Sequence, residues 1–585
     1  MEGGQLQIES NGHMVVMDLA NCPFIDICLA GFGAGRGRIS PASNQFSAEL
    51  RLGIEILQPS LRAMSGTAAV RALEACLNRG AREVGVCAGA RNVPLVLAVA
   101  RSRDLKVWNH FEERGAGFFA LGRVRACGRP VAVVTTSGTA VAELLPAVIE
   151  AHYQGRPLLV VSADRPRSYR GSGAPQAIEQ VGLFGDYVEG MDDLGGAADS
   201  LGIESQWSGL RPWHLNVCLE EEEEVPDLVV PAEEPEPARL PRTGVTELVE
   251  FLNKDSFRGV VVLLGGLEPE EREETCHVLK ELGAPVVAEA TSGLREALGK
   301  LVLTDGDRVL RAQPPGKVLR LGDVPVGRFW RDLESLPATE VLSVTRTGFS
   351  GLARESTVLT GLVHDVFKGM GGVPSIGDVL DLSRAAAKRR GRLEELLERY
   401  PDSEPALVRV LSTYATMGES VFLGNSLPIR EWNLCAQVVA PIVEVQASRG
   451  ANGIDGQLSA WLGATAGQDG GWGVFGDLLV LYDLAAPAWL AQVGGEGRVL
   501  AVINNSGGRI FERLPRLHDL EAGERALMAN AHTQHFGQWA AMWGMDHLVV
   551  TDRDGFDVEP GPVPLVVEIR PDEGQTAAFW EAWEE

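Results

Sequence analysis

The apolar residues of this chain fall into short runs of strand length that alternate with longer segments of helical period. Residues 68–78 repeat their apolar side chains every three or four positions, as an amphipathic helix does. Apolar runs at 83–87, 130–135 and 158–162 have the length of buried strands. Strands that alternate with helices are typical of βαβ units in a mostly parallel sheet, so we expect an α/β domain over residues 65–225.

The same alternation occurs twice more along the chain. The unbroken apolar run 260–264 predicts a buried strand in a second α/β unit over residues 243–400, which a charged helical stretch at 383–399 closes. A third unit, 401–585, ends with the apolar strand 565–569. We therefore predict the α/β class, with three doubly wound parallel-sheet domains.

Two segments do not follow this pattern. Residues 220–224 are all glutamates, which we expect to be solvated, and the proline-rich residues 226–242 have the composition of a linker. Residues 1–64 contain a glycine-rich segment, 31–37, that superficially resembles a nucleotide-binding loop. A dinucleotide-binding turn must open a helix, however, and Pro41 interrupts it. We interpret the segment 1–64 as an N-terminal extension of unknown role.

Charge and composition exclude several classes of partner. The 585 residues carry a formal net charge of −26, which argues against nucleic acid or an anionic membrane surface as the main partner. Eight cysteines are scattered without metal-binding spacing, and no run of about 18 apolar residues occurs. We therefore expect a cytoplasmic protein with no membrane insertion. In so acidic a chain, a site for anionic substrates must concentrate its arginines locally.

Two loops in the third unit have the composition of a diphosphate and magnesium site. Gly476 and Asp477 follow one strand-like run, and Asn505 and Gly507 follow the next, 499–503. Magnesium commonly takes one carboxylate, a few other protein oxygens, water and phosphate oxygens, which the Asp477 carboxylate, the Asn505 amide and the Gly507 carbonyl would supply. Glycines let the backbone approach a phosphate closely, and a helix N-terminus attracts it. The spacing alone fits an ordinary βαβ crossover with turn glycines equally well.

Motifs along the chain resemble those of one enzyme family in the same order. The family is the 2-succinyl-5-enolpyruvyl-6-hydroxy-3-cyclohexene-1-carboxylate synthases of menaquinone biosynthesis, and the likeness runs from about Gly66 to the C-terminus. The segments that carry it are GARNVPL at 89–95, HFEERG at 110–115, TSGTAVA at 136–142, SADRP at 162–166, GNSL at 424–427 with Arg430, SRGANGIDG at 448–456, and the two loops from Gly476 to Phe511.

The resemblance implies a transferase of the thiamin-diphosphate enzyme type. Its three domains would be a pyrimidine-binding domain at 65–225, a central domain at 243–400 and a diphosphate-binding domain at 401–585. The implied cofactors are thiamin diphosphate and Mg²⁺, or Mn²⁺ in its place. The implied substrates are 2-oxoglutarate, which is decarboxylated, and isochorismate, which accepts the resulting four-carbon nucleophile. The implied assembly is a homodimer, or a dimer of dimers, that shares each active site between two chains.

The resemblance also assigns cofactor residues. Glu113 would be the carboxylate that meets the pyrimidine ring nitrogen, whereas its neighbour Glu112 fits a glutamate at the start of a helix. Ile454 would prop the cofactor into its V shape, although taken alone it reads as a core residue. The full implied set for the cofactor is Glu113, Ser426, Ile454, Gly476, Asp477, Leu478, Asn505 and Gly507, of which Asp477, Asn505 and Gly507 would hold the metal.

Both implied substrates are dicarboxylates, which arginines bind best through paired hydrogen bonds. An isolated arginine is more often a surface ion-pair residue, and the polar candidates Gln176 and Ser426 fit turn positions equally well. The implied substrate-binding set is Arg91, Gln176, Arg328, Ser426, Arg430, Arg449 and Phe511.

Four positions depart from the family pattern and put details of substrate binding in doubt. Ala90 and Arg509 stand where serine and glutamine are frequent, and Phe329 replaces a basic residue. Pro487 falls inside the helix expected after Asp477 and should kink it.

Three alternative functions remain open at this point. The first is another thiamin-diphosphate-dependent 2-oxoacid decarboxylase or carboligase, against which the arginines for dicarboxylates argue. The second is an inactive scaffold of the same fold, against which the joint presence of Glu113, Asp477 and Asn505 argues. The third is a nucleotide-dependent oxidoreductase, which would need a glycine fingerprint followed by an acidic residue about 20 positions on.

Overall fold

The computed structural model describes the backbone of residues 5–10 and 13–18, and residues 67–585 except for short gaps. The gaps are 197–198, 221–224, 226, 237, 239, 241–244, 416–419, 438–443, 514–516 and 518–519. Residues Met1–Met64 and Ser65–Glu585 form two compact units. In the first unit, β1 (Gln5–Ser10) pairs antiparallel with β2 (His13–Asp18). The glycine-rich segment 31–37 and four of the five glutamates at 220–224 lie outside the described residues.

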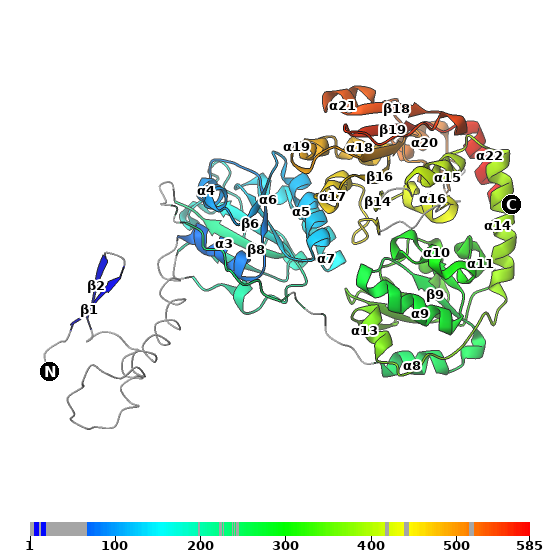
Figure 1. The fold of residues 1–585 in the computed structure, drawn as a ribbon, viewed down its shortest axis with the longest axis horizontal. Helices are drawn as coiled ribbons and strands as arrows, with labels where there is room; N and C mark the ends of the chain where they lie inside the picture. Colours follow the sequence, from blue (N-terminus) through cyan, green and yellow to red (C-terminus); the bar gives the residue numbers. More distant parts are fainter. Residues whose placement is uncertain are drawn as a thin grey trace. The chain divides into compact units, whose positions relative to one another are not determined.

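The second unit contains three sheets, whose strands all pair in parallel (Figure 1). The first sheet has the order β4-β3-β5-β6-β8-β7. Its strands are β3 (Glu83–Val86), β4 (Lys106–Asn109), β5 (Val131–Thr135), β6 (Leu158–Asp164), β7 (Gly190–Leu194) and β8 (Trp213–Cys218). Its helices are α3 (Ala68–Asn78), α4 (Val93–Arg101), α5 (Glu113–Cys127), α6 (Thr139–Glu143) and α7 (Leu145–Gln154). The predicted helix at 68–78 and the three predicted strands are confirmed, with strand ends shifted by one or two residues.

The second sheet has the order β10-β9-β11-β12-β13. Its strands are β9 (Val260–Leu264), β10 (Val286–Ala288), β11 (Lys317–Leu321), β12 (Glu340–Thr345) and β13 (Thr357–Thr360). Its helices are α8 (Thr246–Asn253), α9 (Arg272–Leu282), α10 (Arg295–Leu298), α11 (Gly306–Ala312), α12 (Arg328–Asp332) and α13 (Val363–Lys368). The charged helix predicted at 383–399 is α14 (Leu382–Arg399).

The third sheet has the order β15-β14-β16-β17-β19-β18. Its strands are β14 (Ser420–Leu423), β15 (Glu444–Gln446), β16 (Gly471–Gly476), β17 (Arg498–Ile503), β18 (Asp546–Val550) and β19 (Leu565–Ile569). Its helices are α15 (Glu404–Ala415), α16 (Leu427–Cys435), α17 (Gln457–Ala464), α18 (Asp477–Tyr482), α19 (Leu490–Val493), α20 (Ala522–Ala529), α21 (Gly537–Met542) and α22 (Glu573–Glu584).

Both faces of each sheet are buried, which explains why the strands read as unbroken apolar runs. In β5, Val131 and Val133 belong to one core cluster, whereas Ala132 and Val134 belong to another. The residues of β9 and β17 divide between two clusters in the same alternating way. The predicted α/β class with three doubly wound parallel sheets is therefore confirmed.

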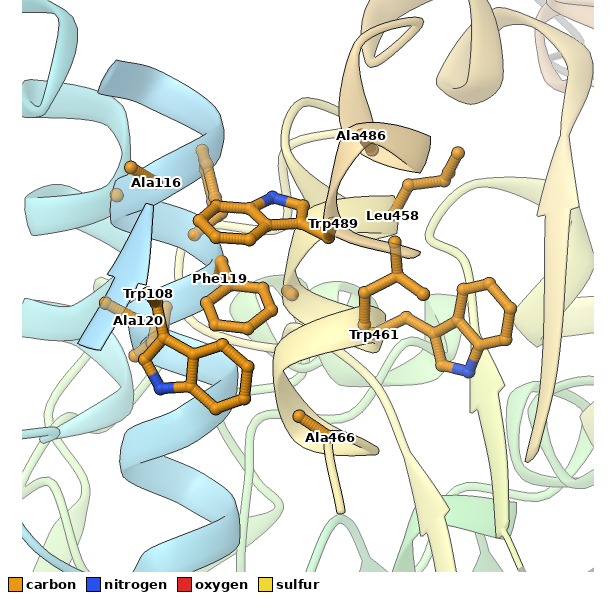
Figure 2. Packing of buried hydrophobic residues seen from close by; sticks show 14 of the residues in the cluster. Trp108, Ala116, Phe119, Ala120, Leu458, Trp461, Ala466, Ala486 and Trp489 are labelled. Atoms are coloured by element: carbon orange, nitrogen blue, oxygen red, sulfur yellow. The ribbon is translucent and has the colours of Figure 1, made fainter. Parts of the chain in front are cut away.

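One core cluster joins helices of the first and third sheets (Figure 2). Helix α5 packs against α17, and the Phe119 and Trp489 rings stack with their centroids 3.8 Å apart. The two helices approach at glycines. A Cβ on Gly122 would lie 2.1 Å from the carbonyl oxygen of Ala460, and a Cβ on Gly463 would lie 2.1 Å from that of Phe119. Any side chain at either glycine would force these helices apart.

The structure corrects the expectation for Pro487. Helix α18 ends at Tyr482, before the proline, and Pro487 lies in the first turn of a separate 3-10 helix, η9 (Ala486–Trp489). A first-turn N–H has no partner within its helix, so proline is tolerated there and kinks nothing.

Phe329 is only 1% exposed and packs in the core of the second sheet, so it does not face a ligand.

Among the described residues, no helix has the length and apolar character to cross a membrane.

Candidate active site

Asp477 and Asn505 lie at the carboxyl ends of adjacent parallel strands, where open α/β sheets bind ligands. Asp477 begins α18 directly after β16, and its loop partner Gly507 follows β17. The Gly507 N–H donates to Asp477 Oδ2 at 2.9 Å, and the Leu478 N–H donates to Oδ1 at 2.6 Å. Burial raises the pKa of the Asp477 carboxyl, while the bond from Gly507 and the nearby His532 ring oppose that shift. The loop after β17 is therefore hydrogen-bonded to Asp477, the one carboxylate among the predicted metal ligands.

Asn505 presents one buried oxygen to this loop. Its Nδ2 donates to both carboxylate oxygens of Glu404, at 3.1 and 3.0 Å. Its Oδ1 is buried and has no hydrogen-bond partner in the described part of the chain. An unpartnered amide oxygen near one carboxylate fits Mg²⁺, which needs few protein ligands when phosphate oxygens supply the rest. No group of three or more histidine, cysteine or acidic side chains with metal-ligand geometry occurs among the described residues, which is consistent with so small a donor set.

Gly507 could not be replaced by a residue with a side chain. Its φ is +139°, and a Cβ there would lie 2.6 Å from the carbonyl oxygen of Ala529. Phe511, in the 3-10 helix Arg509–Arg513, packs on this loop, because a Cβ on Gly508 would lie 3.2 Å from its ring. Arg509 donates from Nε to the Asn505 carbonyl at 2.9 Å. The arginine that departs from the family pattern thus braces the loop that carries Asn505.

Three further predicted residues lie around the same sheet. Ser426, with φ +76°, precedes α16, and its carbonyl accepts a 2.6 Å bond from Arg430 Nη1. Ile454 is half-buried and packs against the core cluster that contains α5. Arg449 is buried and donates from Nη1 to Asn425 Oδ1 at 2.9 Å.

A cavity of ≈ 1350 Å³ opens beside the Asn505 loop, and Arg328 and Arg430 line it together with Asn505. Its lining contains eleven arginines and ten carboxylates, whereas the whole chain carries a net charge of −26. This lining is therefore richer in arginine relative to carboxylates than the chain as a whole. Burial lowers the pKa of Arg430 to about 10, and the charge of Arg449 adds to that shift. Arg328 is exposed and lies 3.6 Å from Asp332.

Glu112 and Glu113 have different environments at the start of α5. The Glu112 side chain caps the helix by accepting from the N–H groups of Arg114 at 3.1 Å and Gly115 at 2.8 Å. Glu113 is the first helical residue and is half-buried. Burial raises the pKa of Glu113, and the neighbouring charges of Glu112 and Glu143 add to that shift. The Glu112 carboxylate is therefore used to cap the helix, whereas the Glu113 carboxylate takes no part in the cap.

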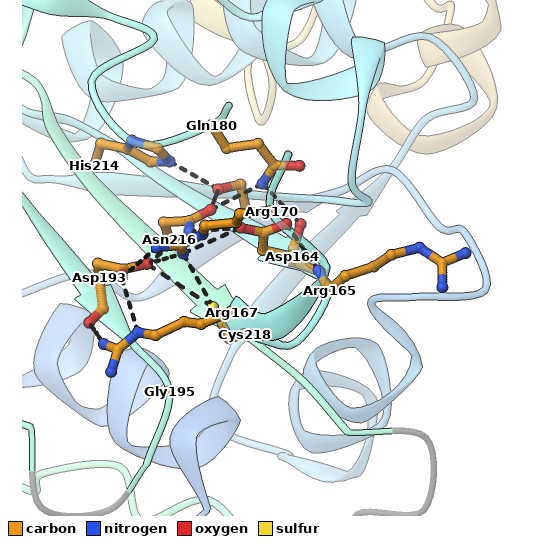
Figure 3. Close-up of polar contacts among 12 residues, drawn as sticks. Asp164, Arg165, Arg167, Arg170, Gln180, Asp193, Gly195, His214, Asn216 and Cys218 are labelled. Carbon is orange, nitrogen blue, oxygen red and sulfur yellow. Dashed lines mark hydrogen bonds and ion pairs between the residues drawn. The ribbon is translucent and has the colours of Figure 1, made fainter. Parts of the chain in front are cut away.

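Gln176 lies on a loop that a buried network holds against the first sheet (Figure 3). Gln180 is fully buried, accepts from the Gly138 N–H at 2.9 Å, and donates to Asn216 Oδ1 at 2.8 Å and the Ala163 carbonyl at 3.0 Å. Gln176 is exposed and adopts φ +58° directly beside Gly138. Ion pairs between Arg170 and the carboxylates of Asp164 and Asp193 extend the network. This loop is therefore pinned at the carboxyl ends of the strands β6, β7 and β8.

Apart from Arg328, which begins α12 beside the second sheet, the predicted residues form two groups at two sheets. Arg91, Glu113 and Gln176 belong to the first sheet, and Arg91 donates to the Leu219 carbonyl at 3.4 Å. The cofactor and metal candidates other than Glu113 belong to the third sheet. The start of α5 meets the end of α18, where Arg114 Nη2 donates to the Tyr482 carbonyl at 2.8 Å, whereas Asp477 begins α18 at its other end.

Two carboxylates around the Asn505 loop were not predicted from the sequence. Glu404 bonds Asn505, and Glu568 on β19 accepts from Asn504 Nδ2 at 2.7 Å. Glu568 is fully buried and is the single charged residue in the apolar strand Leu565–Ile569, a signal that could have identified it. Glu404 starts an ordinary amphipathic helix, and nothing in its local sequence distinguishes it.

Comparison with known proteins supports one family. Residues 66–183 match the family model described as thiamine pyrophosphate enzyme, N-terminal TPP binding domain. A 2-succinyl-5-enolpyruvyl-6-hydroxy-3-cyclohexene-1-carboxylate synthase of Akkermansia muciniphila is 48% identical over 512 residues, which cover 86% of this chain and 96% of that relative. Synthases of the same name are 36% identical in Bdellovibrio bacteriovorus and 33% identical in Chloroflexus aurantiacus. These matches cover 88% and 81% of this chain, and 98% and 87% of the two relatives. The chain therefore belongs to the 2-succinyl-5-enolpyruvyl-6-hydroxy-3-cyclohexene-1-carboxylate synthases, thiamin-diphosphate enzymes of menaquinone biosynthesis.

Proposed function

We propose that this protein decarboxylates 2-oxoglutarate and adds the remaining four-carbon unit to isochorismate, releasing 2-succinyl-5-enolpyruvyl-6-hydroxy-3-cyclohexene-1-carboxylate and CO₂. The observation that carries this proposal is the loop in which the Gly507 N–H donates to Asp477 while Asn505, two residues before Gly507, keeps a buried and unpartnered oxygen beside an arginine-lined cavity. Thiamin diphosphate, when bound, supplies a nucleophilic carbon that attacks the 2-oxoacid carbonyl and accepts the electrons that decarboxylation leaves behind. The protein's own residues would hold the cofactor, orient the substrates against it and take part in its deprotonation.

Glu113 is the proposed base partner of the pyrimidine ring. Burial raises the pKa of Glu113, which makes its carboxylate a stronger proton acceptor than an exposed one. Ile454, on the third domain, would support the cofactor from the opposite side. We further propose that residues 65–225 bind the pyrimidine, that 226–242 link this domain to the central domain, 243–400, and that 401–585 bind the diphosphate.

Asp477, the Asn505 side chain and the Gly507 carbonyl are proposed to hold Mg²⁺ or Mn²⁺ on the diphosphate, with Gly476, Leu478 and Ser426 lining the cofactor. Asp477 would supply the only side-chain charge among these ligands. Asp477→Ala should therefore abolish metal-dependent binding of thiamin diphosphate, measured by calorimetry, while the circular dichroism spectrum stays unchanged. Unchanged cofactor affinity would remove Asp477 from the site.

Arg430, Arg449, Arg91 and Arg328 are the proposed partners of the substrate carboxylates, together with Gln176 and Phe511. Arg430 has the strongest support, because it lines the cavity and its half-buried guanidinium forms no ion pair with a carboxylate in the described part of the chain. A buried guanidinium favours a carboxylate ligand, which restores the charge interaction that burial removes. Arg328 already faces Asp332 and would have to exchange that partner.

We also propose a cytoplasmic homodimer. Exposed apolar side chains lie near the start of α5: Phe111, two residues before it, is 69% exposed, and Tyr482, whose carbonyl accepts from Arg114, is 54% exposed. Exposed apolar side chains that lie close together mark interaction surfaces, and Phe111 is two residues from Glu113. A second copy that covers these side chains would bring its own residues to the pyrimidine domain. The six described cysteines are unpaired, as expected in a reducing compartment.

The function is tested by incubating the purified protein with thiamin diphosphate, Mg²⁺, 2-oxoglutarate and isochorismate and identifying the product by mass. The expected mass should disappear when any component is omitted, and pyruvate should replace 2-oxoglutarate poorly. Equal use of pyruvate would favour a different 2-oxoacid carboligase, and no turnover of any 2-oxoacid would favour a scaffold of this fold.

A further inference from the structure

Glu404 is a buried carboxylate with no part in the proposed chemistry. It is the first residue of α15 and is only 1% exposed. Its backbone N–H donates to Thr576 Oγ1 at 3.0 Å, which ties the start of this helix to α22. Both of its side-chain oxygens accept from Asn505 Nδ2, at 3.1 and 3.0 Å. A carboxyl group buried this deeply needs hydrogen-bond partners, because an unpaired polar group is costly to remove from water.

The chemistry of the two groups determines which way Asn505 faces. A side-chain amide has a donor end and an acceptor end of nearly equal size, so packing alone does not distinguish its two orientations. In the structure both oxygens of Glu404 accept hydrogen bonds from the donor end of the Asn505 amide. In the flipped orientation, Asn505 Oδ1 would meet the oxygens of Glu404, and two acceptors in a buried site repel each other. Glu404 therefore holds the Nδ2 end toward itself.

The opposite end of the amide is then free for a ligand. Asn505 Oδ1 is buried without a partner among the described residues, which is costly unless something else binds it. Asp477 is bonded to Gly507, two positions further along the same loop. Arg509 fixes the Asn505 carbonyl from the other side. The backbone and the amide donor of Asn505 are thus both held, and only Oδ1 is left open.

We propose that Glu404 is a positioning residue, which orients the Asn505 amide so that its oxygen is presented to the divalent cation of the cofactor. This inference rests on the proposed metal site. Partners that orient metal ligands typically change metal affinity by about 10- to 100-fold when they are removed. The same magnitude is expected for Glu404, although it touches neither metal nor substrate.

Glu404→Gln is the direct test, because glutamine keeps the shape but offers a donor as well as an acceptor and no longer fixes the amide. The matched control is Glu394→Gln. Glu394 lines the same cavity, pairs with Arg409 at 2.7 Å and is 56% exposed at its side chain, so this change removes an equal charge without touching Asn505. Affinity is measured by calorimetry with thiamin diphosphate in a Mg²⁺ series, and by electron paramagnetic resonance of Mn²⁺. Glu404→Gln should weaken metal affinity about 10- to 100-fold, and Glu394→Gln should change it less than about twofold.

A reversed pair distinguishes positioning from charge. Asn505→Asp alone sets two carboxylates against each other and should bind the metal complex poorly. In the double variant Asn505→Asp, Glu404→Gln, the glutamine can donate to the new carboxylate, so affinity should recover by at least about tenfold over Asn505→Asp. This comparison also carries the test if Glu404→Gln by itself does not fold.

The outcomes separate the inference from the proposed function. If the wild-type protein binds no metal and thiamin diphosphate, the proposed function itself fails. If the wild type binds them but Glu404→Gln matches Glu394→Gln, or the double variant is no better than Asn505→Asp, the positioning role is refuted. Weakening by Glu404→Gln together with recovery in the double variant supports it.

Discussion

Replacing Glu113 by glutamine should separate catalysis from stability at the start of α5. The two hydrogen bonds that cap this helix, at 3.1 and 2.8 Å, belong to Glu112, so Glu113→Gln removes no cap. Losing a general acid or base typically lowers kcat by about 10²- to 10⁴-fold. This corresponds to about 2.7 to 5.4 kcal/mol in the activation free energy, at about 1.36 kcal/mol for each tenfold.

The same substitution should not lower the stability of the folded protein. Burial raises the pKa of Glu113 in the folded protein, so the folded state binds the proton more readily than the unfolded state. The stability of the wild type therefore falls as the pH rises from the unfolded pKa through the folded one. At pH 8 the glutamine variant avoids this cost, and its unfolding temperature should equal or exceed that of the wild type.

Glu112→Gln is the matched control, one residue away. It loses one of two backbone hydrogen bonds, about 0.5 to 1.5 kcal/mol, and a charge at the helix N-terminus, about 0.3 to 1 kcal/mol. We expect a lower unfolding temperature with kcat within about tenfold of the wild type. Steady-state kinetics and thermal unfolding followed by circular dichroism measure both effects. Glu113→Gln activity within a few-fold of the wild type, or a larger kcat loss in Glu112→Gln, would refute the assignment.

Three further predictions follow from the structure. Arg430→Ala and Arg449→Ala should each cost about 2 to 4 kcal/mol in kcat/KM for 2-oxoglutarate, because a buried carboxylate loses its charged partner; an unchanged KM and kcat would exclude them as substrate residues. Glu289 has its pKa raised to about 7 by burial, so its carboxylate costs stability increasingly from about pH 4.5 to 7, and Glu289→Gln should raise the unfolding temperature more at pH 8 than at pH 5. A gain that is larger at pH 5 would contradict this sign. If each site is shared between two chains, co-folding Glu113→Gln with Asp477→Ala chains should restore about a quarter of wild-type activity, since half of randomly assorted dimers are mixed and each of these has one intact site. No recovery in mixed dimers confirmed by mass spectrometry would place both residues of a site in one chain.

Local sequence determined the class of the fold and the order of its motifs. Strands buried on both faces are apolar at nearly every position, so runs such as 260–264 and 499–503 can be recognised without a structure. Because parallel strands bind ligands at their carboxyl ends, a glycine and a polar residue just after such runs also made Asp477 and Asn505 candidates, although their spacing alone fits an ordinary crossover equally well. These signals are contained within a few consecutive residues.

Only the tertiary structure decided what surrounds those residues. Glu404 lies 101 positions from Asn505, and Glu568 lies 64 positions from Asn504, and no periodic pattern links residues so far apart. The proline in η9 was expected to bend a helix that in fact ends earlier, because a helix end depends on what its last turn packs against. Propensity and pattern act over one or two turns of chain, whereas the packing of three sheets selects which distant carboxylates come to lie against the loop that carries Asn504 and Asn505.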